Sequence, residues 1–528
     1  MWCDLGVVIV GRRAVTLLTS PRLWLPILIL GFGLAHAVWG EIIPINNGQG
    51  WDGKAYAAWA KDFKGQILGA GVSEYYAQRI VPSAIVHAGL RATAQPLDDA
   101  HVVGGFQVYN LILLLIATVT WLLIARKLQF SPAGTWLGFF CLFVNYPILK
   151  NNFYDPVLTD TSAFTLGLLL FYFFLVEEWS GFLAIMVGGA FTWPTLVYEG
   201  LLLYLFPARP HVVPTPAVSA FVSKYHIPTV VALLATLLIV FAMENILFPQ
   251  GYLAAPVSSN ALNQIHPDSA LIQLSLLGAT YYLFFSLRGA LNDSRLFDPG
   301  YLLRAVVWKR LAPLGLLLVT IKGILSTLGN GSSAGNTTDL LVHYTLLTAL
   351  VEPLIFLVAH IVYYGPAVLL LLFFWPRICR LLLSYPLGVR LLVILGLVLG
   401  LNSESRFLIN ILPIFIVLLV QVVESLHWTF NKYVIWGGLA LFASKVWYPI
   451  NTAPLVYDGT YDILRRFPLQ GYFMNYGPWM SAQMYWVQGT AILGAALLVY
   501  WVFVRTPRRS ARPQQQATLR TELDFPSP

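Results

Sequence analysis

The stretch WDGKAYAAWAKDF, residues 51–63, places an aspartate between a tryptophan and a glycine shortly after the first long apolar segment. A carboxylate can act as a general base toward a hydroxyl group, and Gly53 lets the backbone turn beside Asp52 at low steric cost. The same spacing also fits an Asp-Gly turn that leads into a helix on the membrane surface, with Trp59 and Phe63 on one face. Asp52 is therefore a candidate catalytic base, with a turn residue as the alternative.

A later segment adds polar residues that suit a substrate site. In KNNFYDPVLTDTSAF, residues 150–164, Lys150 is a candidate phosphate ligand, and Asp155 precedes Pro156 as in the first turn of a helix. Asp160 falls about one turn into the following apolar segment, where a carboxylate is expected to face the bundle interior or a wet cavity. Asp155 is thus either a structural helix cap or part of a substrate site.

The third segment, LNSESRFLINILP, residues 401–413, places Glu404 and Arg406 in a tight connection between two apolar runs. The two side chains form either a rim ion pair, which would contribute little stability, or an anion site, because a guanidinium suits phosphate well. Arg79 and Tyr56 in the first connection add a cation and an aromatic face. Together these residues predict a site at one membrane boundary where carboxylates activate a hydroxyl and cations neutralise a phosphate leaving group.

The apolar composition indicates that transmembrane helices position these residues. Of the 528 residues, 58% are hydrophobic and 11% charged, whereas soluble chains have about 45–50% and about 25%. Long unbroken apolar runs exclude a β-barrel, whose strands alternate, and a backbone in lipid must satisfy its own hydrogen bonds. The net charge of +8 comes from basic residues between apolar segments and in the tail, as the positive-inside rule expects, so it does not indicate nucleic-acid binding.

The predicted fold class is an all-α polytopic membrane protein of about twelve transmembrane helices. One further apolar stretch, 181–206, is interrupted at Trp193-Pro194 and is interpreted as two half-helices that enter the membrane and return. With that choice most of the 32 Lys and Arg residues lie on the side of both termini, which is predicted to be cytoplasmic. The expected spans are 22–40, 104–125, 133–149, 156–176, 227–248, 269–287, 311–328, 353–374, 387–402, 407–424, 434–447 and 485–504.

The chain is expected to form one transmembrane catalytic domain over residues 1–504, followed by a disordered cytoplasmic tail at 505–528. The long connections then lie outside, and the largest are 41–103 and 448–484. Three widely spaced cysteines indicate neither a disulfide framework nor a metal cluster. No phosphate-binding loop, dinucleotide fingerprint or metalloprotease motif appears, so the sequence requires no cofactor, although a divalent cation is compatible with it.

In their order, these segments resemble the GT-C glycosyltransferases, polytopic enzymes that use polyprenyl-phosphate sugars. WDGKAYAAWA is similar to the Asp-Gly-x-x-Tyr loops of mannosyltransferase-like members, and EYYAQRIVPSAI is similar to the Tyr…Arg-x-x-x-Pro stretch that follows. YDPVLTDTSAF resembles the polar start of a later span, and SESRFLINILP resembles the late Glu-x-Arg segment. The resemblance covers the N-terminal 200 residues and the late hairpin, whereas 207–400 is similar only in its hydrophobicity.

The resemblance implies a helical bundle with a catalytic vestibule on its outer side. Asp52 would be the general base that deprotonates an acceptor hydroxyl, which then attacks the anomeric carbon of the sugar. The polyprenyl phosphate would leave with inversion, held by Arg79 and Arg406. Asp155 would shape the acceptor site or help to hold a divalent ion.

The resemblance also implies partners and a location. The donor would be a polyprenyl-phosphate-linked sugar, and the acceptor a glycan, lipid or protein hydroxyl outside the membrane. The motifs are most similar to bacterial members, which places the protein in an inner membrane with a periplasmic active site. Gly53 stands where members often carry a second acidic residue, so a partner carboxylate would have to come from Asp62, Glu74 or Asp155.

Two other function classes fit parts of the sequence. A transporter or flippase for a lipid-linked glycan is supported by Glu199 and by the Trp193-Pro194 break, although the chain shows no internal repeat. A glycan polymerase or ligase of another membrane fold would use the large late connection 448–484, which contains a further Asp-Gly-x-Tyr at Asp458.

Overall fold

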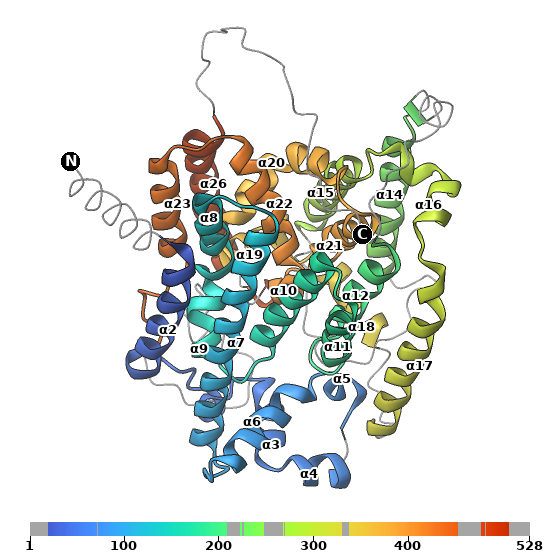
Figure 1. Cartoon of the computed structure of the whole chain (residues 1–528). Coiled ribbons are helices and arrows are strands. Elements are labelled where there is room, and N and C mark those ends of the chain that lie inside the picture. The colour runs from blue at the N-terminus through green and yellow to red at the C-terminus, as the bar shows by residue number, and fades with distance from the viewer. Residues whose placement is uncertain are drawn as a thin grey trace, which may run out of the picture.

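The computed structural model shows a bundle of helices with a cap of shorter helices at one end (Figure 1). Within the residues that it describes, the only β-pairing is an isolated bridge between Val72 and Gly329. The all-helical prediction is therefore confirmed for that part of the chain. The structure describes residues 20–70, 72–207, 222–223, 226–247, 268, 270–329, 337–451, 477–480 and 482–505.

Several helices are long and apolar enough to cross a membrane, which marks the chain as an integral membrane protein. The described residues contain five such helices, or up to seven if each of two bent pairs is one span. The prediction of about twelve full crossings is not confirmed. The five are α2 (Pro21–Trp39), α7 (Asp99–Lys127), α14 (Ile227–Leu247), α17 (Leu311–Leu328) and α26 (Ala482–Val499).

The two bent pairs show why a count of apolar segments overestimates straight spans. The expected span 353–374 is broken between α19 (Ile355–Tyr364) and α20 (Ala367–Leu382), which meet at 114°. Gly365 has a φ of +76°, and Pro366 follows it, so the chain turns where an α-helix cannot continue. The pair Pro132–Phe143 and Tyr146–Tyr154 is bent by 62°.

Other apolar helices are too short to span the membrane alone and fill the middle of the bundle. The expected interruption at Trp193-Pro194 is present, because two separate helices flank it and pack against each other. These short helices are α10 (Asp160–Val176), α11 (Trp179–Ala190), α12 (Thr195–Leu205), α21 (Leu387–Leu399) and α22 (Leu412–Ser425).

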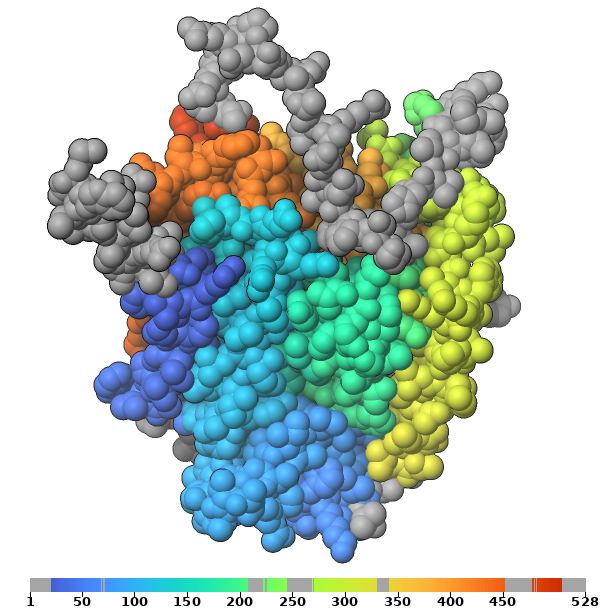
Figure 2. Space-filling model, in the orientation of Figure 1, coloured from blue at the N-terminus to red at the C-terminus, as the bar shows by residue number. Residues whose placement is uncertain are grey.

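Part of the first long connection folds into a helical cap at one end of the bundle (Figure 1), and Figure 2 shows that it covers this end. The expected surface helix over Lys54–Phe63 corresponds to α3, whose Tyr56 and Trp59 are buried rather than facing lipid. Their rings meet the ring of Tyr76 at 6.1 and 5.4 Å between centroids, so aromatic packing closes the cap. The cap helices are α3 (Gly53–Lys61), α4 (Phe63–Gly65), α5 (Glu74–Ala77) and α6 (Ile80–Ala92).

Some predicted features lie outside the described residues. These are the tail beyond Arg505, the greater part of the late connection 448–484 with Asp458, and most of 249–268.

Helix α10 packs closely against the hairpin between α21 and α22. A Cβ atom added at Gly167 would lie 2.2 Å from the backbone oxygen of Asn410, so the two segments touch through bare backbone. Gly167→Ala should therefore force α10 and the hairpin apart and destabilise the protein by about 1–3 kcal/mol.

Thermal unfolding of the detergent-solubilised chain measures this effect. Gly188→Ala is the matched control, because a Cβ at this helical glycine would meet no atom within 4 Å. The control should leave the Tm unchanged or raise it slightly. Equal Tm values for the two variants would contradict the close packing of α10 on the hairpin.

Candidate functional site

A buried arginine forms the centre of the candidate site. Arg406 lies in the hairpin between α21 and α22, and its guanidinium faces the carboxylate of Asp160 at the first turn of α10. Nε lies 3.1 Å from Oδ1 and Nη2 lies 2.9 Å from Oδ2, which is a bidentate charge-assisted pair. Only 17% and 10% of the two side chains are exposed, so the pair is largely withdrawn from water.

The third guanidinium nitrogen faces two further carboxylates. Nη1 of Arg406 lies 3.6 Å from Oδ2 of Asp52 and 3.6 Å from Oε1 of Glu404. These distances are within the range of ion pairing but too long for hydrogen bonds. The Asp52 side chain is 40% exposed, against 21% for Glu404. Of the carboxylates around Arg406, Asp52 is therefore the one most open to an incoming molecule.

The hairpin is held in place by hydrogen bonds from α19. Nδ1 of His360 lies 2.8 Å from Oγ of Ser405, and Nε2 lies 2.9 Å from the carbonyl oxygen of Gly400. The hydroxyl of Tyr364 donates to the carbonyl oxygen of Ser405 at 2.6 Å. Because all of these groups are buried, they leave the backbone beside Arg406 little freedom to move.

Glu404 accepts a hydrogen bond from a residue of α18 (Thr337–Thr348). The hydroxyl of Tyr344 donates to Oε2 of Glu404 at 2.7 Å. Burial raises the pKa of Glu404, and the positive charge of Arg406 opposes that rise. The hydrogen bond from Tyr344 thus fixes the Glu404 carboxylate. The Asp52 carboxylate, at the N-cap of α3, makes no capping hydrogen bond to the backbone of that helix.

Arg79 and Arg406 both lie close to the indole ring of Trp193. The Arg79 guanidinium carbon is 3.9 Å from the ring centre of Tyr75 and 5.9 Å from that of Trp193, while the Arg406 guanidinium carbon is 5.8 Å from the same Trp193 ring. Nη1 of Arg79 donates a hydrogen bond to the carbonyl oxygen of Tyr75, at 2.7 Å. Arg79 is 4% exposed and has no carboxylate partner among the described residues. Burying a cation without a counter-charge costs free energy unless an anion binds beside it.

Two buried oxygens near the cluster also lack partners. The hydroxyl of Tyr56 makes no hydrogen bond to another described residue, although it lies within the electrostatic reach of Asp52, Arg79 and Arg406. Oδ1 of Asp155 likewise has none. Buried polar atoms are usually satisfied in a folded protein, so unpaired groups around a charged cluster indicate room for a polar ligand.

Asp155 lies against the turn that precedes Asp52. A Cβ at Gly50 would come within 2.6 Å of Oδ1 of Asp155, and Gly50 has a φ of +67°, so a glycine is required there on two grounds. Burial raises the pKa of Asp155 to about 8; the negative charges of Asp160 and Asp52 add to the rise, and Arg406 opposes it. Asp155 thus lies beside the cluster, and its surroundings favour the protonated carboxyl.

Lys150 has different partners. Its ammonium lies 2.8 Å from Oε2 of Glu41 and donates to the carbonyl oxygen of Tyr448 at 3.0 Å. Glu41 also accepts from the backbone N–H groups of Ile450 and Asn451. Burial acts to raise the pKa of Glu41, but these donors lower it overall. Lys150 therefore joins the first and last connections, and a role in binding substrate stays a prediction for it.

The sequence-based site and the observed cluster overlap in most members. Asp52, Glu404 and Arg406 meet directly, and the structure adds Asp160, which was noted as an intramembrane carboxylate but not placed in the site. The sequence signal for Asp160 is its position one turn into an apolar helix, where a carboxylate usually serves a function. Two buried residues, Trp193 and His360, carried no such signal, because an indole at a helix break and a histidine in an apolar run are common in helix cores.

Within the described ranges, no group of three or more His, Cys, Asp or Glu side chains is arranged to hold a metal ion. The carboxylates of Asp52, Asp160 and Glu404 surround the Arg406 guanidinium. No protein-family model, curated protein or solved structure shows a significant match to this chain.

The raised pKa of Asp155 predicts a pH-dependent stability. A folded-state pKa of about 8 against the ordinary 3.8 means that protonation stabilises the fold fully at acid pH, and that this contribution is lost as the pH rises through 8. Asp155→Asn keeps the shape without the titration. The Tm of the variant should therefore rise relative to wild type between pH 5 and pH 8, where the difference in unfolding free energy changes by at most about 4 kcal/mol.

Thermal scans of both proteins at several pH values in the same detergent provide the measurement. Asp62→Asn is the control, since Asp62 is exposed and caps α4. A Tm difference between Asp155→Asn and wild type that stays constant with pH would show that Asp155 does not titrate in this range.

Proposed function

We propose that this protein is an inverting glycosyltransferase of the GT-C type. It would move a sugar from a polyprenyl-phosphate donor to a hydroxyl of a glycan, lipid or protein. The observation that carries the proposal is the Asp52 carboxylate, which is partly open to solvent beside an arginine that a buried aspartate holds in place. The cap that carries Asp52 would face the periplasm of a bacterial cell, with both termini in the cytoplasm.

In the proposed reaction Asp52 acts as the general base. It accepts the proton of the acceptor hydroxyl while the hydroxyl oxygen attacks the anomeric carbon of the donor sugar. The bond from that carbon to the phosphate oxygen breaks, and the electron pair leaves with the polyprenyl phosphate. Because attack and departure take place on opposite faces of the anomeric carbon, the configuration inverts.

The two arginines would have unequal roles toward the leaving phosphate. Arg406 already has two of its nitrogens on Asp160, so only Nη1 is directed toward the open side of the cluster. Arg79 has no carboxylate partner among the described residues, and its guanidinium is already desolvated. A desolvated cation placed in advance stabilises developing negative charge without further reorganisation. We assign the main phosphate contact to Arg79.

Aromatic rings supply the walls that a sugar and a prenyl chain require. Trp193 lies close to both arginines, and its ring centre is 6.0 Å from that of Phe407. The ring of Tyr344 also packs against Phe407, at 6.2 Å. The apolar ring faces suit the isoprene units, and the unpaired Tyr56 hydroxyl offers a polar contact to a sugar hydroxyl.

A flippase for a lipid-linked glycan is the second candidate, and one observation favours it. Glu199 is fully buried in α12, where Asn410 donates to its Oε2 at 3.0 Å and its Oε1 has no partner. An ionisable residue at such a place in a membrane protein is a marker of transport pathways. Its link to Asn410, four residues after Arg406, equally fits a role in holding the candidate site.

Replacing Asp52 by asparagine tests the enzyme proposal. Asp52→Asn keeps the shape but cannot accept a proton, so sugar transfer should fall by about a hundredfold or more. The assay is transfer of label from a panel of radiolabelled polyprenyl-phosphate sugars by the purified full-length chain. Asp62→Asn is the control: the Asp62 carboxylate is exposed and accepts from the backbone N–H of Gly65 as the cap of α4 rather than facing Arg406, so this variant should keep wild-type activity.

The same preparations distinguish the second candidate. If every donor is inert, and labelled lipid changes leaflet in liposomes at the same rate with wild type and Asp52→Asn, the protein is a flippase and Asp52 is a turn residue.

Arg79 provides a separate test of donor binding. Arg79→Gln removes the cation from the phosphate, so the donor KM should rise about tenfold or more, and kcat should fall as charge on the leaving group goes uncompensated. Arg79→Lys should recover part of the loss, because the point charge remains. Arg91→Gln is the control and should change neither constant, because Arg91 is exposed in the last turn of α6, the helix that Arg79 precedes as its N-cap. An unchanged donor KM in Arg79→Gln would remove Arg79 from the phosphate site.

A further inference from the structure

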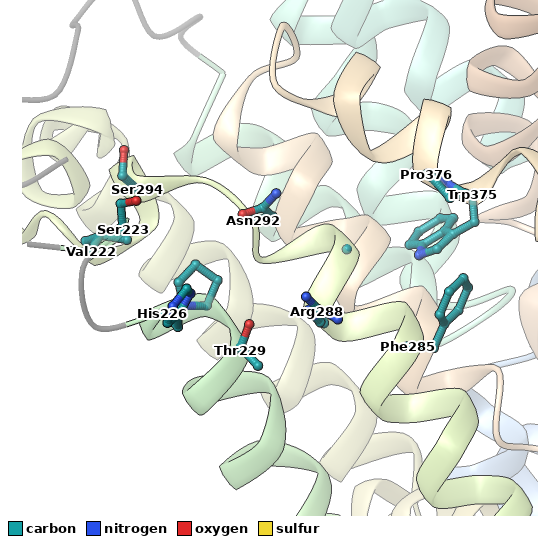
Figure 3. Close-up of a pocket in the computed structure, with 12 residues that line it drawn as sticks. Val222, Ser223, His226, Thr229, Phe285, Arg288, Asn292, Ser294, Trp375 and Pro376 are labelled. Atoms are coloured by element: carbon teal, nitrogen blue, oxygen red, sulfur yellow. The ribbon is translucent and has the colours of Figure 1, made fainter. Parts of the chain in front are cut away.

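A pocket separate from the Asp52 cluster lies at the end of the bundle opposite the cap. It is a cavity of about 530 Å³ between the start of α14, the end of α15 (Ile272–Ala290) and the middle of α20 (Figure 3). It shares no lining residue with the Asp52 cluster. In Figure 1 these helix ends lie on the far side of the bundle from α3–α6.

The polar part of this cavity is rich in hydrogen-bond donors, and none of the described residues that line it carries a carboxylate. Arg288 lines it near the end of α15, and Figure 3 shows His226 and Thr229 of the α14 start near the Arg288 side chain. No hydrogen bond or ion pair to another described residue engages the guanidinium of Arg288. The other polar lining residues are Ser223, Asn292 and Ser294.

The nearest acidic residue along the chain is already neutralised. Asp293 is buried and pairs with both Arg295 and Arg390. Its negative charge is therefore shared between two guanidinium groups and leaves Arg288 uncompensated. A donor-lined cavity with one unpaired guanidinium favours an anion, and a guanidinium matches the oxygens of a phosphate group.

The remaining wall of the cavity is apolar and continues along a lipid-facing helix. Phe285 and Trp375 line the cavity on the side away from His226 (Figure 3). Phe285 is 41% exposed, and its ring stacks on that of Tyr281 one turn earlier, which is 68% exposed. Leu277 and Leu274 continue this exposed stripe of α15. The cavity also lies at the end of the candidate membrane span α14, the level at which lipid headgroups lie.

We propose that this cavity binds the phosphate group of an anionic phospholipid. The phosphate would lie against Arg288, with Thr229 and Asn292 as neutral hydrogen-bonding partners. An acyl chain would follow the stripe from Phe285 to Leu274. The site is separate from the Asp52 cluster and does not depend on the function proposed there.

Lipid titration followed by native mass spectrometry tests the site. The full-length chain in detergent is titrated with palmitoyl-oleoyl phosphatidylglycerol, with palmitoyl-oleoyl phosphatidylcholine, and with inorganic phosphate alone. Wild type should retain the anionic lipid in preference to the zwitterionic one. Arg288→Gln should weaken retention about tenfold, and Arg288→Lys should weaken it less.

Arg380→Gln is the matched control for general electrostatic attraction. Arg380 is an exposed cation on α20, near Trp375 in sequence, but it does not line the cavity. The control should retain phosphatidylglycerol within about twofold of wild type. Inorganic phosphate that displaces the lipid in wild type but not in Arg288→Gln would support the phosphate contact. Equal lipid retention by the Arg288→Gln and Arg380→Gln variants, or no preference for the anionic lipid, would overturn the proposal.

Discussion

The ion pair between Arg406 and Asp160 is the constraint on which the candidate site depends. Removing two charges from water is costly, and a bidentate geometry offsets that cost only if both partners are held in register. The hydrogen bonds that α19 makes to the Arg406 hairpin and the backbone contact of α10 with it supply that register. Once the pair is formed, the remaining guanidinium nitrogen of Arg406 has a fixed position, and the cap brings Asp52 to it.

Differences in solvent exposure separate the carboxylates around this arginine into different tasks. Asp160 is bidentate and buried, so its charge serves to hold Arg406. Asp155 is buried without a cation in contact, and burial favours its neutral form. Asp52 is the most exposed carboxylate beside Arg406, at 40% against 21% for Glu404, whose carboxylate also accepts a hydrogen bond from Tyr344. A group that must take a proton from an incoming hydroxyl needs such an environment, since it must be ionised and also reachable.

The sequence predicted which charged residues lie together better than it predicted the path of the chain. Asp52, Glu404 and Arg406 were expected to meet because polar residues at the same ends of apolar segments converge, and they do. The straight span at 353–374 failed because hydropathy does not report direction, whereas Gly365-Pro366 turns the helix by 114°. For Lys150, the sequence suggested a place in the site but did not predict its contacts. Its spacing suited the site, but only the three-dimensional structure shows that Glu41 and Tyr448 engage it.

The position of Trp193 links the broken helix pair to the proposed chemistry. A continuous helix through 181–206 would present ordinary side chains to lipid, whereas the break turns an indole ring toward the two arginines. The N–H of Val81, at the start of α6, donates to the carbonyl oxygen of Phe191 in this break at 3.1 Å. That hydrogen bond ties the cap to the break, two residues from Arg79 on one side and from Trp193 on the other. The irregular backbone thus costs helical hydrogen bonds but fixes the spacing of the two cations, and a phosphate could contact both only if that spacing is kept.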